Sequence, residues 1–369
     1  MDFATTEGQR LVTELAEATL ARLADDQRLR RVTDGWDRPT WHALTEAGLL
    51  TAFVPEAAGG GGMGILELCS LLVAVGARAV PVPILATLAM GAWPLTTYGG
   101  EGAYASLAAL GEGRAIWTGA FAESNARDPL RPRVTARLRG RQWRLSGRKI
   151  SVPAAQHASG FVVTARTEEG PALFTVERGG IENSGGDSGM VVEARIGIED
   201  GGLGDLRLDD APATLLAFGA EAVALWVDHV TVAICALQLG LAQGALRKTA
   251  HYVSSRTQFG VAVGSFQAVS QRMADGWIDT QTMEVTLWRT ASRLARGEDA
   301  RRDVHVARYT ACNAAHRVLM SAQHLHGGIG FDRDYPLLRY TLLARQWELV
   351  LGGAAEHQAR LGAFLAGAA

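Results

Sequence analysis

The run Arg133-Val134-Thr135-Ala136-Arg137-Leu138 alternates polar and apolar residues, which is typical of a β-strand with one buried face. Three further short runs follow along the chain: Phe161-Val162-Val163-Thr164, Leu173-Phe174-Thr175-Val176 and Asp205-Leu206-Arg207-Leu208-Asp209. Turn residues separate the runs, at Arg139-Gly140, Ser146-Gly147, Gly179-Gly180 and Gly201-Gly202. Residues 114–216 are therefore predicted to form an antiparallel β domain, with the glycine-rich stretch 179–204 in loops between strands.

Both flanks of this β block have a helical period instead. On the N-terminal side apolar residues recur at helical spacing, at Leu11, Leu15, Ala18 and Leu20 and again at Trp41, Leu44 and Leu49. On the C-terminal side the period returns in long stretches that include residues 266–296 and 304–325. The chain is thus predicted to be an α+β protein of three domains: an N-terminal α-helical domain (1–113), a middle β domain (114–216) and a C-terminal helical bundle (217–369).

Composition bounds the kind of partner that the chain can have. With 369 residues, of which 48% are hydrophobic, the chain is long enough to bury a large core. Lys and Arg total 36 against 38 Asp and Glu, which leaves a formal net charge of −2. So small a charge gives no broad field that would attract nucleic acid or an anionic membrane. We expect neither as a partner.

The cysteines and the N-terminus point to the cytoplasm. Cys69, Cys235 and Cys312 stand far apart, form no Cys-x-x-Cys pair and leave one over, which suits a reducing compartment better than a disulfide framework. The stretch Met1 to Glu7 is acidic and polar where a secretion signal would be basic and then apolar. We therefore expect a cytoplasmic protein.

Two apolar stretches need a membrane test. Residues 71–93 include an arginine and two prolines, and residues 230–246 are interrupted by Gln238 and Gln243. Both fall short of the ~20 uninterrupted apolar residues that span a bilayer. The second stretch is apolar nearly all round, which predicts a helix buried in the middle of a bundle.

The segment Ser255-Arg256-Thr257-Gln258-Phe259-Gly260 is a first candidate site. It follows a helical stretch and ends at a glycine, and Gln267 lies eleven residues past Arg256. An arginine at a helix end is more often a solvated side chain near the negative end of the helix dipole. Taken alone, this segment leaves both interpretations open.

The segment Gly327-Gly328-Ile329-Gly330, preceded by His324-Leu325-His326, is a second candidate. It is either an ordinary helix C-terminus with glycine past the last turn, or a backbone that another molecule approaches closely, as the ADP part of a dinucleotide would. The two histidines stand two apart and share no helix face. With no third ligand at a recognisable spacing, no metal site is predicted.

Taken together, these segments resemble the C-terminal half of acyl-CoA dehydrogenases. The resemblance rests on Arg256-Thr257-Gln258-Phe259-Gly260, Ser265-Phe266-Gln267-Ala268-Val269, Arg272-Met273-Ala274-Asp275 and the run from His326 to Pro336, in that order. The N-terminal stretches Gly48-Leu49-Leu50, Val54-Pro55-Glu56 and Gly59 to Gly64 are similar to the first domain of that family. The family's fold, an N-terminal helical domain, a middle β domain and a C-terminal four-helix bundle, agrees with the order that periodicity predicts.

The resemblance implies a flavoprotein with FAD that removes the α and β hydrogens of an acyl-CoA thioester. A carboxylate takes the α-proton while the β-hydrogen leaves as hydride to the flavin, so a base of suitable pKa must lie within reach of that proton. In the family this base is a Glu in a Tyr-Glu-Gly-Thr loop after the Tyr-Pro segment, or a Glu on the buried helix. Both places can be read in this sequence.

Neither place carries an acid. Counting from Tyr335-Pro336 without a gap puts the loop base at Leu351, and matching Glu356-His357-Gln358 to the family's Glu-x-Gln puts it at Gly352. The helix base would stand at Val230. Asp228, two residues away, would point off another side of the helix. No catalytic residue is therefore predicted in this chain.

The positions that would contact the flavin ring are altered as well. Where the family has a Trp-x-Thr on a strand of the β domain, this sequence has Ser151 and Pro153, and a proline lacks the backbone donor. The family's Thr-Glu-Pro-x-Ala-Gly-Ser-Asp loop is represented only by Ala122-Glu123-Ser124-Asn125-Ala126-Arg127-Asp128. The chain's own flavin-ring site is expected to be degraded.

By contrast, the positions that in this family reach a neighbouring subunit's FAD are retained. Arg256 suits a pyrophosphate, because a guanidinium is always charged and fork-shaped. His324 stands where a Gln is more usual. The expected cofactor-binding residues are Arg256, Gln258, Phe259, Gln267, His324, Leu325, His326, Gly327 and Gly328.

This combination resembles the small subunits of the actinobacterial α2β2 acyl-CoA dehydrogenases that shorten steroid side chains. It implies a catalytic acyl-CoA dehydrogenase subunit as partner, an acyl-CoA substrate bound mainly by that partner, and an electron-transfer flavoprotein or similar acceptor. Two alternatives stay open. One is an active homomeric enzyme of the same fold with another base, such as Asp228, Glu348 or Glu356; the other is a relative with different flavin chemistry or no redox role.

Overall fold

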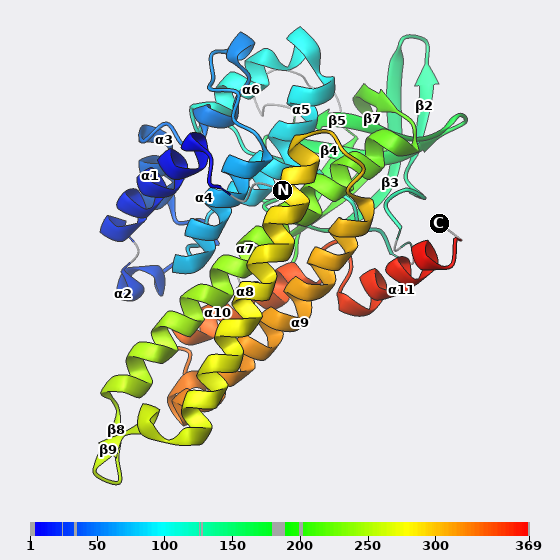
Figure 1. Cartoon of the computed structure of the whole chain (residues 1–369). Coiled ribbons are helices and arrows are strands. Elements are labelled where there is room, and N and C mark those ends of the chain that lie inside the picture. Colours follow the sequence, from blue (N-terminus) through cyan, green and yellow to red (C-terminus); the bar gives the residue numbers. More distant parts are fainter. Residues whose placement is uncertain are drawn as a thin grey trace. The chain divides into compact units, whose positions relative to one another are not determined.

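The structure is a computed structural model that describes residues 4–23, 25–32, 35–124, 126, 128–178, 189–198 and 202–367 (Figure 1). Its packing divides the chain into two compact units. Unit 1 comprises residues 1–32, 65–80 and 231–369, and unit 2 comprises residues 33–64 and 81–230. Both units are thus assembled from segments that are far apart in the sequence.

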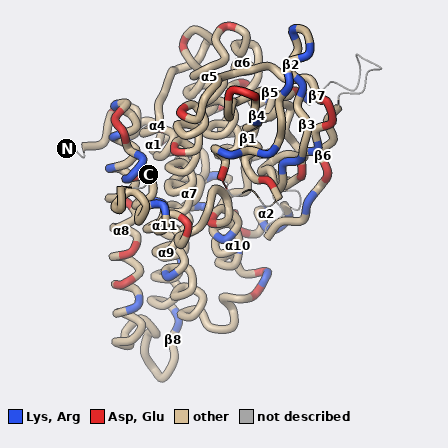
Figure 2. The backbone as a smooth tube through the Cα atoms, turned by 90° about the vertical axis from the view of Figure 1, so that its right-hand side faces the viewer, with Lys and Arg blue, Asp and Glu red and all other residues tan. Residues whose placement is uncertain are grey.

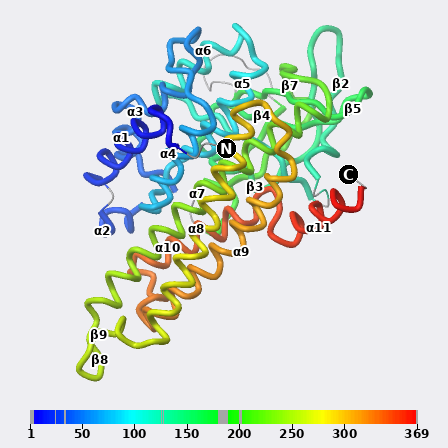
Figure 3. Tube along the Cα trace, viewed as in Figure 1, coloured from blue at the N-terminus to red at the C-terminus, as the bar shows by residue number. Residues whose placement is uncertain are grey.

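Unit 1 is helical. Its elements are α1 (Glu7–Leu23), α2 (Asp26–Leu29), α4 (Ile65–Arg78), the greater part of α7 (Ala220–Ser255), the hairpin β8 (Thr257–Gln258) and β9 (Val261–Ala262), η5 (Val263–Ser265), α8 (Gln267–Ala295), α9 (Arg301–His326), η6 (Gly327–Phe331), α10 (Leu337–Glu348) and α11 (Ala354–Leu365). The helices α7, α8 and α9 run alongside one another, as the green, yellow and orange parts of the trace in Figure 3 show. The two long helices expected over 266–296 and 304–325 correspond to α8 and α9.

Glycines bring α4 and α7 into close contact. A Cβ atom on Gly240 would lie 2.2 Å from the carbonyl oxygen of Val73, and one on Gly244 would lie 2.4 Å from that of Ala77. Gly76 faces α7 in the same way from the α4 side. The two backbones approach this closely only because these positions lack side chains. This contact explains why α4 packs in unit 1 although its neighbours in sequence belong to unit 2.

Helix α7 is the one helix of the described chain that is long and apolar enough to span a membrane, with a mean hydropathy of 1.7. However, 89% of that stretch is buried inside the protein. Val230, Val232 and Leu241 are all 0% exposed. The helix is therefore a core helix, as the sequence predicts for residues 230–246.

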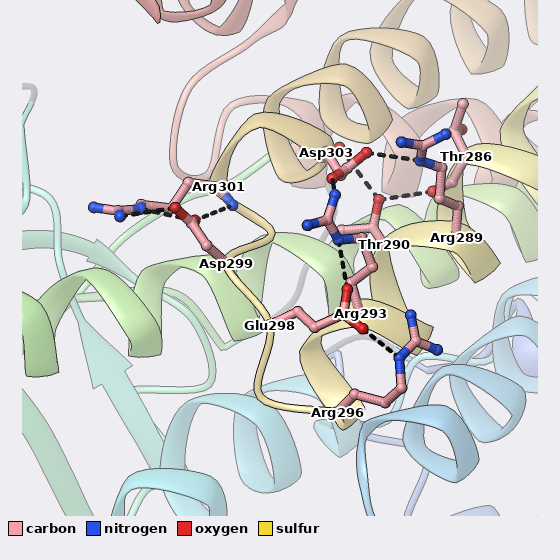
Figure 4. Close-up of polar contacts among 9 residues, drawn as sticks. All are labelled: Thr286, Arg289, Thr290, Arg293, Arg296, Glu298, Asp299, Arg301 and Asp303. Atoms are coloured by element: carbon pink, nitrogen blue, oxygen red, sulfur yellow. Dashed lines mark hydrogen bonds and ion pairs between the residues drawn. The ribbon is translucent and has the colours of Figure 1, made fainter. Parts of the chain in front are cut away.

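The turn between α8 and α9 is tied by ion pairs (Figure 4). Asp303, in the first turn of α9, accepts hydrogen bonds from Arg289 Nε at 2.8 Å and from Arg293 Nη1 at 2.7 Å. Thr290 Oγ1 also donates to the carbonyl oxygen of Asp303 at 3.2 Å. A carboxylate at a helix N-terminus is favoured by the helix dipole. These contacts fix the end of α8 against the start of α9.

Unit 2 combines short helices with the β-sheet. Its elements are α3 (Arg38–Glu46), η1 (Thr51–Phe53), η2 (Glu56–Ala58), η3 (Ala86–Ala92), α5 (Trp93–Tyr98), η4 (Gly100–Ala103), α6 (Tyr104–Gly111), β1 (Trp117–Ala120), β2 (Thr135–Arg139), β3 (Gln142–Val152), β4 (Gly160–Thr167), β5 (Gly170–Glu177), β6 (Met190–Ala194), β7 (Gly204–Phe218) and the first residues of α7. The strands β2, β4, β5 and β7 lie at the four alternating runs of the sequence, whereas no such run marked β1 or β3.

The sheet differs from the expectation in two respects. Its seven strands follow the order β1-β4-β2-β3-β7-β5, with β6 paired to β7 and a further β4–β5 pairing. It is mixed rather than purely antiparallel, because β1 and β2 both pair with β4 in parallel. The stretch 179–204 also contains a strand, β6, that was expected to be loop; Gly179, Gly180 and Gly201 lie outside the described residues.

The missed strand has a physical reason. Among the described strands β6 pairs with β7, and all five of its residues are exposed or half-exposed, so its run of apolar residues is short and does not alternate with polar ones as a strand with one buried face would. The strand β6 is held by its antiparallel hydrogen bonds to the long strand β7. As for the expected domain limits, α6 ends at Gly111 before β1, and β7 ends at Phe218 before α7. What the limits miss is that the N-terminal helices divide between the two units.

Candidate cofactor-binding site and base positions

Three elements of unit 1 meet at the end of the bundle that carries the β8–β9 hairpin (Figure 1). Arg256 is the first residue after α7, and its backbone N–H donates to the carbonyl oxygen of Tyr252 at 2.8 Å. The N–H of Val263 donates to the carbonyl oxygen of Arg256, also at 2.8 Å. These bonds fold the hairpin back beside Arg256. The guanidinium of Arg256 is left exposed and makes no side-chain bond within the described chain.

The tip of the hairpin presents an aromatic ring to solvent. Phe259 is 93% exposed and has a φ of +53°, which is unfavourable for a residue with a side chain. Burying a phenylalanine is worth about 1.5–3 kcal/mol, and this chain alone forgoes that. Phe266 is the nearest ring, at 6.3 Å between centroids. A strained, exposed Phe259 beside the exposed Gln258 suits contact with a second molecule.

Gln267 begins α8 and is exposed at its N-terminus. The preceding residue, Phe266, has an extended backbone and supplies no side-chain cap. The first N–H groups of this long helix therefore lack a capping side chain. Such an end stabilises a phosphate, and Arg256 approaches the same end of the bundle through the hairpin.

The end of α9 is open on its outer side. Gly327 has φ +65° and ψ −143°, a conformation that only glycine adopts without strain. A Cβ atom on Gly327 or Gly328 would meet nothing within 4 Å, so the backbone here is accessible to a ligand. His324, one turn earlier, is exposed too. This open backbone, with Arg256 and the uncapped α8, fits the ADP part of a dinucleotide.

His326, unlike the exposed His324 and Gly327, is buried. Its ring is 4% exposed and stacks on Tyr252, with centroids 4.3 Å apart, and Tyr335 packs against it at 5.2 Å. Burial lowers the pKa of His326, and its Nδ1–H donates to the carbonyl oxygen of Ala322 at 2.8 Å. The side chain of His326 therefore links α7 to α9, while Leu325 is half-buried.

The loop that would carry the base lies between α10 and α11. Leu351 has φ +60° and Gly352 has φ +94°. A Cβ atom on Gly352 would lie 2.6 Å from Oε2 of Glu356. The other oxygen of that carboxylate accepts a hydrogen bond from Arg360 at 2.5 Å. The carboxylate of Glu356 thus fills the space beside the expected base position and is paired with a cation.

Arg308, which the sequence did not single out, holds this loop from within. Its guanidinium is 0% exposed, and Nη1 donates to Gln238 Oε1 at 2.6 Å. Nη2 donates to the carbonyl oxygens of Trp347 at 2.7 Å and Val350 at 2.9 Å. A buried cation at the C-terminus of α10 is favoured by the helix dipole. The only sequence signal was an arginine among small apolar residues of α9.

A histidine pair closes the other side of the loop. His357 Nε2 lies 3.1 Å from the carbonyl oxygen of Leu351, and His357 Nδ1 lies 3.1 Å from His305 Nδ1. Burial, with Arg308 nearby, lowers the pKa of His357 to about 3; burial, with Arg360 nearby, lowers the pKa of His305 to about 4. Both rings are neutral, so Nε2–H of His357 donates to the loop and its bare Nδ1 accepts from His305.

The other candidate bases are also engaged. Val230 is 0% exposed on α7, and Asp228 is 8% exposed and already has an interaction within the protein. Glu348 accepts a hydrogen bond from Arg345 Nη1 at 2.6 Å. The residues at the three expected base positions, Leu351, Gly352 and Val230, carry no carboxylate of their own.

In unit 2, the two altered flavin-ring positions are used by the β domain itself. Ser151 has φ +51°, and its N–H donates to Asp205 Oδ1 at 2.8 Å. Pro153 is buried, and its carbonyl oxygen accepts a hydrogen bond from Thr118 Oγ1 at 2.7 Å. Both residues therefore contribute to the packing of unit 2.

The retained Glu123 of the degraded loop is buried in an ion pair. It accepts from the backbone N–H of Arg133 at 2.6 Å and of Val134 at 3.2 Å, and Lys149 Nζ lies 2.6 Å from its Oε1. Burial lowers the pKa of Lys149 to about 8, and Glu123 opposes that shift. Asn125 and Arg127 of the same loop lie outside the described residues. Glu123 thus has a structural role here.

Among the described residues, no group of three or more His, Cys, Asp or Glu side chains is placed to hold a metal ion. The three cysteines are buried as free thiols, and burial raises the pKa of each. A thiol with a raised pKa is a poor nucleophile and a poor ligand at neutral pH.

Known proteins resemble this chain over nearly its whole length. Residues 5–104 match the family described as "Acyl-CoA dehydrogenase, N-terminal domain", and residues 219–363 match "Acyl-CoA dehydrogenase, C-terminal domain". The acyl-CoA dehydrogenase FadE27 of Mycobacterium tuberculosis is 34% identical over 382 residues, which cover 99% of this chain and 99% of FadE27.

Solved structures give the same picture. The Tcur3481-Tcur3483 steroid ACAD G363A variant has a TM-score of 0.91 and 35% identity, covering 99% of both chains. The ChsE4-ChsE5 complex from Mycobacterium tuberculosis has a TM-score of 0.91 and 34% identity, again over 99% of both chains. PigA, solved with FAD and proline, shares the fold with a TM-score of 0.89 at 22% identity over 100% of both chains.

Proposed function

Since this chain belongs to the acyl-CoA dehydrogenase family, we propose that it is a non-catalytic subunit of a FAD-dependent acyl-CoA dehydrogenase, which contributes ADP-side contacts to the cofactor of a catalytic partner. The observation that carries the proposal is the loop at Leu351 and Gly352. It has no proton acceptor of its own, and Arg308 and His357 bind its carbonyl oxygens.

The chemistry explains why this loop decides the matter. Dehydrogenation needs a base on the α-proton within hydrogen-bond reach, and a group that accepts the β-hydrogen as hydride. Bound FAD supplies the hydride acceptor. None of the residues at the expected base positions, Leu351, Gly352 and Val230, can accept the α-proton, so in this proposal the partner supplies that carboxylate.

The residues that remain have a binding role in this proposal. Arg256 pairs its guanidinium with the pyrophosphate, and the uncapped N-terminus of α8 at Gln267 adds backbone donors. Gly327 and Gly328 let the backbone approach the adenosine part closely. Phe259 and Gln258, at the exposed hairpin tip, lie against the cofactor or the partner. None of these contacts removes a proton.

The likeness to paired proteins supports a hetero-oligomer. Two of the solved relatives are named as pairs, ChsE4-ChsE5 and Tcur3481-Tcur3483, and the second is named a steroid ACAD. By extension, we propose an α2β2 heterotetramer with a catalytic acyl-CoA dehydrogenase subunit that binds most of the acyl-CoA. The proposed substrate is a steroid side-chain CoA thioester, the proposed acceptor an electron-transfer flavoprotein or similar protein, and the proposed location the cytoplasm.

The test is co-expression with a catalytic homologue that carries the loop Glu. We expect two flavins per tetramer and acyl-CoA oxidation in the complex, with poor FAD retention and no oxidation by this chain alone. Arg256→Ala in this chain should lower the flavin content of the complex, whereas Arg22→Ala, on the exposed last turn of α1, should not. Four flavins per tetramer, or robust oxidation by the single chain, would contradict the proposal.

A second candidate function rests on Glu356. Its carboxylate lies where the side chain of residue 352 would begin, so an active homomeric enzyme could use Glu356 as its base. In that case Glu356→Gln would abolish acyl-CoA oxidation by the purified single chain. Asp228→Asn and Glu348→Gln serve as matched controls at the other acids. Loss of oxidation only in Glu356→Gln would favour this candidate over the partner proposal.

A further inference from the structure

A cavity of about 650 Å³ lies within unit 1, among α1, α4, α7 and α8. It shares no lining residue with the expected ADP contacts or with the loop at Gly352. Its volume is within the range of about 300–1,000 Å³ that is typical of small-molecule sites. The proposed function therefore leaves this cavity unexplained.

The cavity has both apolar and polar lining residues. Val73 and Ala77 of α4 and Leu239 of α7 make up an apolar floor with Trp288 of α8, while α7 and α8 also contribute the polar residues Gln243, Arg247, Glu284 and Ser292. The lining residues of α1, with Thr6 just before it, are all polar: Thr6, Gln9, Arg10, Thr13, Glu14 and Glu17. These residues recur three and four apart, so they form one face of the helix. An occupant would thus need one apolar face and one polar face.

Several of the polar groups have no partner among the residues that the structure describes. Within the described chain, the side chains of Arg10, Thr13, Gln243 and Arg247 make no hydrogen bond or ion pair. Yet all of them line the same cavity. Convergent polar groups around an apolar floor are what a ligand site requires.

The charged residues that line the cavity narrow the class of ligand further. Arg10 and Arg247 line the cavity together with three carboxylates, those of Glu14, Glu17 and Glu284. A polyanion such as a nucleotide or CoA would be repelled by the carboxylates. A ligand with one acid group and several hydroxyl donors satisfies both kinds of side chain, because a carboxylate accepts hydrogen bonds and donates none. Figure 2 shows both signs of charge along α8 as well.

Arg247 marks the end of the cavity where the acid group would lie. Gly240 packs on Val73 and Gly244 on Ala77, so α4 and α7 run in the same direction. Arg247 is therefore about one turn beyond the end of the apolar floor. An apolar body on that floor places its terminal acid beside Arg247.

We propose that this cavity binds a rigid, facially amphipathic organic acid with hydroxyl groups on its polar face. The apolar face lies on Val73, Ala77 and Leu239 against Trp288, the hydroxyl groups face α1, and the acid pairs with Arg247. This inference goes beyond the proposed function and does not depend on FAD, on a partner or on catalysis.

The probe is cholate, a steroid acid with hydroxyl groups on one face, titrated calorimetrically at submicellar concentration into the purified full-length chain. We expect saturable binding with one site per chain. Dodecanoate, which has an acid but no hydroxylated face, should bind at least tenfold more weakly, and CoA should not bind. Absence of saturable cholate binding, or equal affinity for dodecanoate, would overturn the proposal.

Two variants locate the site. Arg247→Ala should weaken cholate binding about tenfold through loss of a charge-assisted hydrogen bond, and Arg247→Lys should restore part of it. Thr13→Trp should block the cavity, and Arg22→Ala, elsewhere on α1, should leave binding unchanged. Circular dichroism of each variant confirms folding. Unchanged cholate affinity in both Arg247→Ala and Thr13→Trp would overturn the proposal, because the probe would then bind elsewhere.

Discussion

Oε2 of Glu356 lies 2.6 Å from the position that a Cβ atom on Gly352 would take. The side chain that would carry a base at this position is therefore missing, and a neighbouring carboxylate already fills the space where it would start. Gly352 also has φ +94°, where residues with a Cβ atom are strained. Restoring an acid here thus requires more than one substitution.

We first predict that Gly352→Glu does not give this chain acyl-CoA oxidation. The new side chain meets Glu356, and the positive φ costs about 1–3 kcal/mol. Gly353→Glu is the matched control, since Gly353 has a negative φ and its Cβ would meet only a carbonyl oxygen at 3.9 Å. Urea unfolding should show a larger loss in Gly352→Glu than in Gly353→Glu. An active Gly352→Glu single chain would contradict the prediction.

Removal of Arg308 should destabilise unit 1 strongly. Arg308→Met leaves Gln238 and the carbonyl oxygens at the end of α10 without their donor, and each buried unsatisfied group costs about 1–3 kcal/mol. We expect a loss of at least about 3 kcal/mol in the free energy of unfolding. Arg302→Ala, at an exposed position of α9, is the control and should change it by less than about 0.5 kcal/mol. A loss as small as the control's would show that water replaces the guanidinium.

The His305–His357 pair should make stability depend on pH. The pKa of each ring is lowered from 6.5 in the unfolded chain, to about 4 for His305 and about 3 for His357. Above pH 6.5 both states are neutral, so the pair's contribution is fully present. As pH falls from 6.5 toward 4, the unfolded state binds protons that the folded state does not, and stability is lost.

The slope cannot exceed about 1.4 kcal/mol per pH unit for each histidine. Thermal unfolding between pH 4 and 8 measures it. The variant with His305→Gln and His357→Gln should lose this part of the pH dependence, whereas His42→Gln, at an exposed position of α3, tests an unrelated histidine. Identical pH profiles in the double variant and the original chain would contradict the assignment.

Two glycine-to-alanine substitutions should have opposite effects. Gly240→Ala would place a Cβ atom 2.2 Å from a backbone oxygen of α4, which forces the helices apart and costs at least about 1–3 kcal/mol. Gly362→Ala, in α11, meets nothing within 4 Å and should stabilise the protein by about 0.5–1 kcal/mol. Urea unfolding of each variant measures the change in the free energy of unfolding. A neutral Gly240→Ala would mean that α4 and α7 can shift apart at little cost.

The sequence predicted the elements better than their assembly. Helices α8 and α9 and the strands at Phe161 and Leu173 follow directly from their periodicity, which reports one buried face of a local segment. The parallel pairing of β4 and the strands β1, β3 and β6 were not predicted, because strand pairing depends on partners elsewhere in the chain. Likewise, no local pattern shows that Gly240 packs on Val73.

The candidate site divides in the same way. Arg256, Gln267 and Gly327 were predicted from motif order, and the structure gathers them at one end of the bundle. The packed ring of His326 was not predicted, because its contacts with Tyr252 and Tyr335 arise only when α7, α9 and the following turn meet. Arg308 and His357 were missed for the same reason, since a buried polar residue is recognised by its partners and not by its neighbours in sequence.

The close packing of α4 on α7 also sets the order in which this protein can fold during synthesis. Val73 packs on Gly240, which is synthesised much later, so α4 leaves the ribosome long before the α7 surface that it contacts has been made. Until then the side of α4 that packs on α7 is exposed, and the segments of unit 2 on either side can fold first. Nascent chains that stop before α7 should therefore be the ones that chaperones bind and proteases remove.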